Sequence, residues 1–254
     1  MSIIVGAVSQ LYQGDLDVGR HVLEELARDD LGDNVSLEDF HYGAVAVTQR
    51  LEELDPYTLV IVGPEERDRE PGTVERRRID SLDIDPADVQ VAIGDAGTGY
   101  VTVGLLLEVA WGLEALPPRT VTIELEPVLV GPGEEMSAEA RAAVPQLADL
   151  VRAEVRRAPL LELADRIRGR LEVEGDRLEP SPAVEALEAL LDELEIVDRE
   201  GRWGRTFAER DRLKLRISMG ETGEGMDQLD WGMWWGLIEE IDRIQPLESQ
   251  PPYH

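Results

Sequence analysis

Apolar positions along the first 155 residues follow two different spacings, which predict strands and helices in turn. Continuous apolar runs at residues 3–8 and 57–62 are typical of strands buried on both faces. Shorter strands are expected at residues 34–38, 73–78, 89–93 and 120–125. Helical spacing occurs at residues 18–28, 44–54, 101–113 and 136–155, with Pro145 expected to bend or split the last helix. Strands that alternate with helices predict an α/β fold, with a twisted, mostly parallel sheet as the middle of three layers.

The pattern changes after about residue 157. Helices are predicted at residues 160–168, 182–194 and 229–244, the second with Ser181 as N-cap and Pro182 in the first turn. Hairpins are predicted at residues 171–178 and around Gly201, followed by a strand in which Leu213, Leu215 and Ile217 alternate with polar residues. We therefore divide the chain into an α/β domain, residues 1–156, and a smaller α+β or helical segment, residues 157–254.

Charge and composition narrow the classes of function. The net charge is −29, Lys214 is the only lysine, and cysteine is absent, which excludes disulfides and thiolate metal sites. Nucleic acids and anionic membranes would repel such a chain. No apolar run is long enough for a membrane span and no signal peptide is evident, so we expect a cytoplasmic protein. The acidity fits either adaptation to a saline cytoplasm or an acidic interaction surface.

Several segments of the first domain match one known family in order. The opening IIVGAVSQLYQGDLDVGRHVLEEL reads as a strand, an acidic loop and a helix, and LEDFHYGAVAV as a second strand followed by a small-residue loop. The turn Pro71-Gly72-Thr73-Val74 and the closing LEPVLVGPGEEMSAEARAAV follow. Together they resemble the hydrogenase maturation proteases, endopeptidases that trim the C-terminus of the nickel-iron hydrogenase large subunit. The resemblance covers about three-fifths of the chain and leaves residues 157–254 without a counterpart.

The resemblance implies a site that reads the nickel carried by the substrate through two acidic residues and a histidine. Its first acidic position falls on Leu16, which cannot bind a metal, and the second falls on Asp39. The histidine is expected within residues 95–99, where none occurs, and the aspartate that ends the third strand is Gly63. Because two of three ligands are missing, we expect a degenerate or repurposed member that recognises a hydrogenase large subunit with lost or altered proteolysis.

Two alternatives stay open. The first is an active endopeptidase with a rebuilt nickel site made from Asp15 or Asp17 together with Asp39, His41 and Asp95. All five are expected at the carboxyl ends of the strands, where ligands gather in open α/β sheets, and oxygen and imidazole ligands suit nickel. On a strand, residues two apart face the same side, so Asp39 and His41 would lie together. The second alternative is a binding module outside hydrogenase assembly.

A cluster of tryptophans marks the C-terminal segment. Trp231, Trp234 and Trp235 crowd one predicted helix, together with several aliphatic residues. Tryptophan is enriched at protein interfaces. The cluster predicts a partner-binding surface, unless the same residues simply pack the helix onto the rest of the chain.

Overall fold

The computed structural model describes residues 2–96, 101–174, 180–222 and 231–248. The chain divides into two compact units, Met1–Val155 and Arg156–His254, and each is considered by itself. The elements of the first unit are β1 (Ile3–Ala7), η1 (Asp15–Asp17), α1 (Val18–Leu26), β2 (Val35–Asp39), α2 (Ala44–Leu54), β3 (Thr58–Pro64), β4 (Val74–Ile79), α3 (Pro86–Ala96), α4 (Val103–Gly112), β5 (Arg119–Leu125) and α5 (Ala138–Glu174), which runs on into the second unit.

The first unit is built on a five-stranded sheet with the order β2-β1-β3-β5-β4. β1 pairs in parallel with β2 and β3, and β3 pairs in parallel with β5. Only β4, at the edge, runs antiparallel to its neighbour β5. Every residue of β1, β3 and β5 is buried, as expected for strands covered on both faces. The predicted α/β class with a mostly parallel sheet is confirmed.

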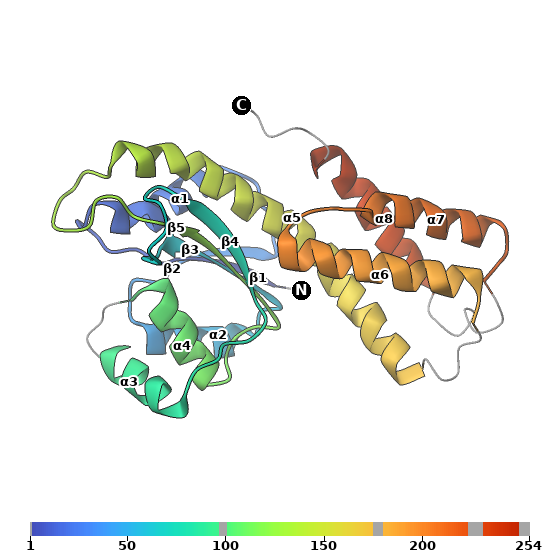
Figure 1. Cartoon of the computed structure of the whole chain (residues 1–254), viewed down its shortest axis with the longest axis horizontal. Helices are drawn as coiled ribbons and strands as arrows, with labels where there is room; N and C mark the ends of the chain where they lie inside the picture. Colours follow the sequence, from blue (N-terminus) through green and yellow to red (C-terminus); the bar gives the residue numbers. More distant parts are fainter. Residues whose placement is uncertain (1, 97–100, 175–179, 223–230, 249–254) are drawn as a thin grey trace. The chain divides into compact units, whose positions relative to one another are not determined.

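Helices cover both faces of this sheet, which gives the three predicted layers (Figure 1). α1 and α5 lie on one face, and α2, α3 and α4 lie on the other. Aliphatic residues of α2 and α4 pack against β1 and β3 in one apolar core. Phe40, which follows β2, belongs to this core, and its ring fills the space beside Gly6 of β1, where an added Cβ would come within 1.8 Å of it. The close approach of Phe40 therefore requires glycine at position 6.

Two predictions in the first unit are wrong. Residues 89–93, expected as a strand, belong to the helix α3. α5 also continues through Pro145, so the proline does not split the helix. Buried residues on both sides of the proline, including Ala143 and Leu147, hold the helix against the sheet and offset the lost backbone hydrogen bond.

The described part of the second unit is entirely helical. It contains the end of α5, α6 (Pro182–Glu200), α7 (Thr206–Ser218) and α8 (Trp231–Glu248), packed around one core. The prediction for Ser181 is confirmed, because its Oγ accepts a hydrogen bond from Val184 N at 3.2 Å. Within the described residues, no helix combines the length and apolarity needed to cross a membrane.

The predicted hairpins and strand of this unit are wrong. α6 runs to Glu200, and Gly201 (φ 69°) caps its end in the left-handed conformation rather than turning a hairpin. Leu213 and Leu215 lie in α7, where the first is buried and the second exposed. Of the hairpin at 171–178, residues 171–174 are helical, and 175–179 lie outside the described residues.

Candidate functional site

A small pocket lies at the carboxyl ends of β1 and β3, where the sequence placed the site. Its volume is about 100 Å³, and Leu16 of η1 forms part of its wall. The other lining residues are Val8, Gln10, Pro64, Glu65, Glu66, Val101 and Thr102. Leu16 is 7% exposed, so its apolar side chain takes part in closing this end of the sheet.

One of the two carboxylates that line this pocket, Glu65, caps a helix. It accepts hydrogen bonds from the backbone N–H groups of Val103 and Gly104 in the first turn of α4. Thr102 Oγ1 accepts a third from Leu105 N at 3.1 Å. Burial raises the pKa of Glu65 above its usual value, in spite of these hydrogen bonds and the nearby charge of an arginine. The N-terminal N–H groups of α4 are therefore satisfied from within the protein.

The end of β3 has no room for another ligand. A Cβ on Gly63 would lie 2.7 Å from the carbonyl oxygen of Val8 and 3.1 Å from its Cβ. Gly19 in α1 meets the same carbonyl oxygen, at 2.4 Å from its own Cβ position. The backbone after β1 therefore packs tightly against β3 and α1, and any side chain at position 63 would push these elements apart.

Asp15 lies in η1 beside this pocket and is fully buried. Its Oδ2 accepts hydrogen bonds from Val128 N and Leu129 N, both at 2.9 Å, and from Ser137 Oγ at 2.8 Å. Its Oδ1 accepts a fourth from Ser137 N at 2.6 Å. Burial alone would raise the pKa of Asp15, but these hydrogen bonds outweigh it and hold the pKa below the usual value. Both oxygens thus fix the loop between β5 and α5.

Asp17, predicted as an alternative ligand, lies at the start of α1. Its carboxylate accepts hydrogen bonds from Arg20 Nε at 3.0 and 3.1 Å, one turn along the helix. His21 Nε2 lies 3.8 Å from the same carboxylate. Asp17 is therefore occupied by an ion pair at the end of a helix.

Asp39, the last residue of β2, and His41, two residues beyond it, lie close together, as the sequence predicted. His41 Nδ1 is 3.3 Å from Asp39 Oδ1, which also accepts a weak hydrogen bond from Ser9 Oγ at 3.4 Å. The aspartate thus lies between the serine and the histidine, and both contact the same carboxylate oxygen. Tyr42 packs edge-on against the histidine ring, and burial raises the pKa of its phenol.

The remaining predicted ligand, Asp95, falls near the end of α3, and its side chain lies outside the described residues, as do residues 97–100. Among the side chains that the structure describes, no group of three or more histidines, aspartates or glutamates could hold a metal ion. The residues at the pocket, with Leu16 and Gly63 in place of acids, do not fit the nickel-reading set that the resemblance implies.

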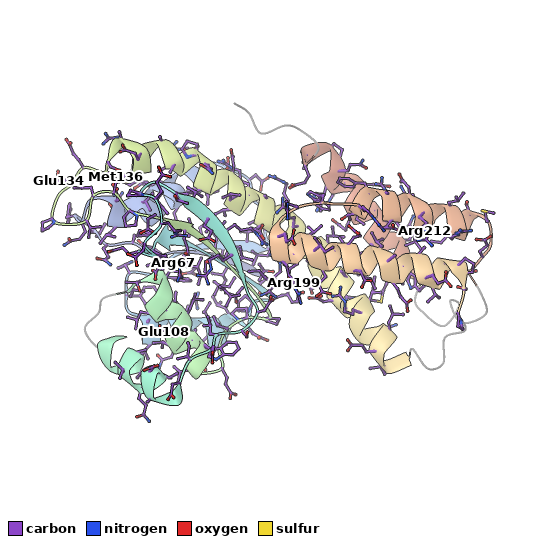
Figure 2. All side chains as sticks on the ribbon, viewed as in Figure 1. Arg67, Glu108, Glu134, Met136, Arg199 and Arg212 are labelled. Carbon is purple, nitrogen blue, oxygen red and sulfur yellow. The ribbon has the colours of Figure 1, made fainter. Side chains whose placement is uncertain are left out.

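The carboxyl end of β5 carries a paired charge cluster. The buried carboxylate of Glu124 accepts hydrogen bonds from Arg67 Nε at 2.6 Å and from Thr122 Oγ1 at 2.8 Å. Arg67 N donates in turn to Glu126, which also accepts from Arg69 Nε at 2.9 Å. Figure 2 shows Arg67 beside the sheet. The acids balance the arginines, so this cluster stabilises the edge of the sheet and offers no net positive charge to an anion.

The tryptophans of α8 occupy different environments. Trp234 is 2% exposed and packs in the core of the second unit with Leu237 and Ile241. Trp235 is half exposed. The side chain of Trp231 lies outside the described residues. A partner could therefore reach Trp235 directly, whereas contact with Trp234 would require the core to open.

Comparisons with known proteins bear on the α/β unit. No protein-family model and no curated protein matches the sequence. The hydrogenase maturating endopeptidase HybD from E. coli is similar in structure, with 19% identity, a TM-score of 0.50, and coverage of 62% of this chain and 94% of that one. The hydrogenase maturation protease HycI from Thermococcus kodakarensis has 19% identity and a TM-score of 0.45, over 61% of this chain and 91% of its own.

The α/β unit has the fold of a hydrogenase maturation endopeptidase. The predicted resemblance is thus confirmed at the level of the fold. On this fold, the pocket beside Leu16 lies where the sequence match placed the missing acid. Two residues of the site were not predicted. Glu65 directly follows β3, and Ser137 donates a hydrogen bond to Asp15 although the two are more than a hundred residues apart in the sequence. The acid pair at residues 65–66, next to the missing aspartate, was a signal available in the sequence.

Proposed function

We propose that this protein recognises the large subunit of a nickel-iron hydrogenase during its maturation and holds it without cleaving it. The observation that carries this proposal is the pocket at the ends of β1 and β3, which Leu16 lines in place of an acid. The tight packing around Gly63 supports it, because a second acid has no space there. The endopeptidase fold supports the choice of partner. The net charge of −29 favours a protein partner over a nucleic acid, and we expect the protein to act in the cytoplasm.

The decisive experiment measures the intact mass of a nickel-loaded large-subunit precursor before and after incubation with this protein at high salt. An unchanged mass together with a complex on size-exclusion chromatography supports a binding protein. Loss of the C-terminal peptide would refute the non-catalytic role, and an unchanged mass without a complex would refute the hydrogenase partner. A maturation endopeptidase acting on its own precursor is the positive control.

A second candidate is an endopeptidase with a rebuilt site. The observation that favours it is the pair Asp39 and His41, whose oxygen and nitrogen atoms lie 3.3 Å apart. If this site cleaves, Asp39→Asn and His41→Gln should each abolish loss of the C-terminal peptide. The Asp149→Asn variant, which changes an arginine-bound carboxylate that is not among the candidate ligands, should retain it. Equal cleavage by all three variants would refute this site.

A further inference from the structure

Five exposed apolar side chains form one surface at the carboxyl edge of the sheet. They come from two segments, the loop after β1 and the loop between β5 and α5, and we call them the apolar ledge: Leu11, Tyr12, Val128, Leu129 and Val130. Each is between 44% and 65% exposed. Figure 2 shows the second loop extending from the sheet, with Glu134 and Met136 labelled. Apolar side chains gathered on ordered backbone mark interaction surfaces more reliably than scattered ones.

Backbone hydrogen bonds join the two segments. Asp15 N donates to Leu129 O at 2.9 Å, and Gly133 N donates to Tyr12 O at 2.9 Å. Gly14 N closes the contact by donating to Gly133 O at 3.2 Å. The backbones of the two loops therefore pair over a short stretch, and the apolar residues of both loops belong to the same surface.

A buried side chain holds the ledge in one conformation, and one ledge residue is kept in a strained backbone conformation. The buried carboxylate of Asp15 binds the N–H groups of Val128 and Leu129, which are themselves ledge residues. Tyr12 has a φ of 61°, a left-handed conformation that is costly for a residue with a side chain. A surface ordered in advance binds more tightly, because less conformational entropy is lost on binding.

Charge indicates what the ledge binds. Its two segments contain no lysine or arginine, and Glu134 and Glu135 stand exposed next to it. Arg141 reaches the loop only at its end, where it donates a hydrogen bond to Met136 O at 2.6 Å. A second copy of this chain would bring the same glutamates together on molecules that each carry a charge of −29. A segment with basic residues beside its apolar ones would instead complement the ledge.

We propose that the apolar ledge is the docking surface for a segment of the hydrogenase large subunit in which apolar side chains are flanked by lysine or arginine. This inference rests on the proposed function, since it names the surface by which the partner is held. The apolar side chains of the partner cover the ledge, and its basic residues lie against Glu134 and Glu135.

The test measures the Kd of the full-length chain for the large-subunit precursor by biolayer interferometry. The ledge variant is Leu129→Ser/Val130→Ser, which keeps the backbone groups that bind Asp15. The matched control is Val91→Ser/Leu113→Ser, which also changes one exposed valine and one exposed leucine of the same unit. We expect the ledge variant to raise Kd by about tenfold or more and the control by less than about threefold.

A second variant guards against misfolding. In Tyr12→Gly the apolar ring is lost, but glycine suits the left-handed backbone, so the fold is retained while Kd rises. Equal Kd values for the wild type and both ledge variants would overturn the inference and leave the proposed function standing. A wild-type chain that does not bind the precursor would overturn both. A wild-type dimer that the ledge variant converts to monomers would assign the ledge to a second copy and overturn the inference.

Discussion

The most direct test of the structural reasoning is the substitution Asp15→Asn. Asp15 is fully buried, and its carboxylate accepts four hydrogen bonds, three on Oδ2 and one on Oδ1. Asparagine has nearly the same size, but one of its two terminal atoms is a donor. Whichever way the amide is turned, that donor faces at least one N–H or O–H group of Val128, Leu129 or Ser137.

The cost can be worked from these contacts. A hydrogen bond to a charged group contributes about 1.5–3 kcal/mol, so four such bonds would give an upper bound near 12 kcal/mol. The amide oxygen can keep the three donors on one side, at reduced strength, while the bond to Ser137 N is lost. The loop also stands at the surface, where water can satisfy the freed groups. We therefore expect a loss of about 3 kcal/mol of unfolding free energy at pH 7.

The loss should also depend on pH. Hydrogen bonding holds the pKa of Asp15 below its usual value in the folded state, so its contribution is present above the usual pKa and disappears as pH falls through the folded pKa. Urea denaturation followed by circular dichroism should therefore show the difference between wild type and Asp15→Asn at pH 7 and a smaller one near pH 3.

The control is Asp17→Asn, whose carboxylate binds a partly exposed arginine and should cost about 1 kcal/mol or less. Hydrogen exchange should in addition show faster exchange of the Leu129 amide in Asp15→Asn only. The assignment of a stabilising role to Asp15 is wrong if the unfolding free energy of Asp15→Asn lies within about 1 kcal/mol of the wild-type value, or if the two variants are equally destabilised.

Three further outcomes are expected. Gly63→Ala should destabilise the protein by about 1–3 kcal/mol in urea denaturation, because its Cβ would lie 2.7 Å from Val8 O; an unchanged midpoint would mean that the strands shift freely. Burial raises the pKa of Glu65, so the charged carboxylate destabilises the fold. This destabilisation is absent at low pH, grows as pH rises above the usual pKa of glutamate, and is complete above the folded pKa. Glu65→Gln should therefore be more stable than the wild type at pH 7 and equal to it near pH 4, and a gain that persists at pH 4 would contradict this. Trp234→Ala should cost about 3–5 kcal/mol in thermal unfolding and Trp235→Ala less than about 1, because only the first is buried; similar losses would argue against the core assignment.

The sequence predicted the centre of the sheet well, because β1 and β3 are buried on both faces and show as uninterrupted apolar runs. The strand predictions were wrong where exposed aliphatic residues of a helix alternate with polar residues along the sequence. In α3 Ala92 is buried, whereas Val91 and Ile93 on either side of it are exposed. In α7 Leu215 is likewise exposed. Periodicity assumes that apolar residues face the core, so helices that expose them are mistaken for strands.

The features of the candidate site that depend on residues close together in the sequence were predicted. The position of Leu16 at the sheet edge and the contact between Asp39 and His41 both follow from where their strands end. The role of Asp15 does not, because its partners Val128 and Ser137 lie more than a hundred residues away and three of its four hydrogen bonds come from backbone N–H groups common to almost every residue. Sequence alone cannot distinguish an aspartate that holds a loop from one that awaits a metal.

The fit of Phe40 against Gly6 bears on how such a protein evolves. The ring fixes the chain just after β2, between Asp39 and His41, and leaves no space for a side chain on the neighbouring strand. A larger residue at position 6 therefore requires a smaller one at position 40 in the same lineage, whereas the more exposed Asp39 and His41 can change singly. Among descendants of this chain we expect the glycine and the phenylalanine to change together or not at all, because each residue sets the space that is left for the other.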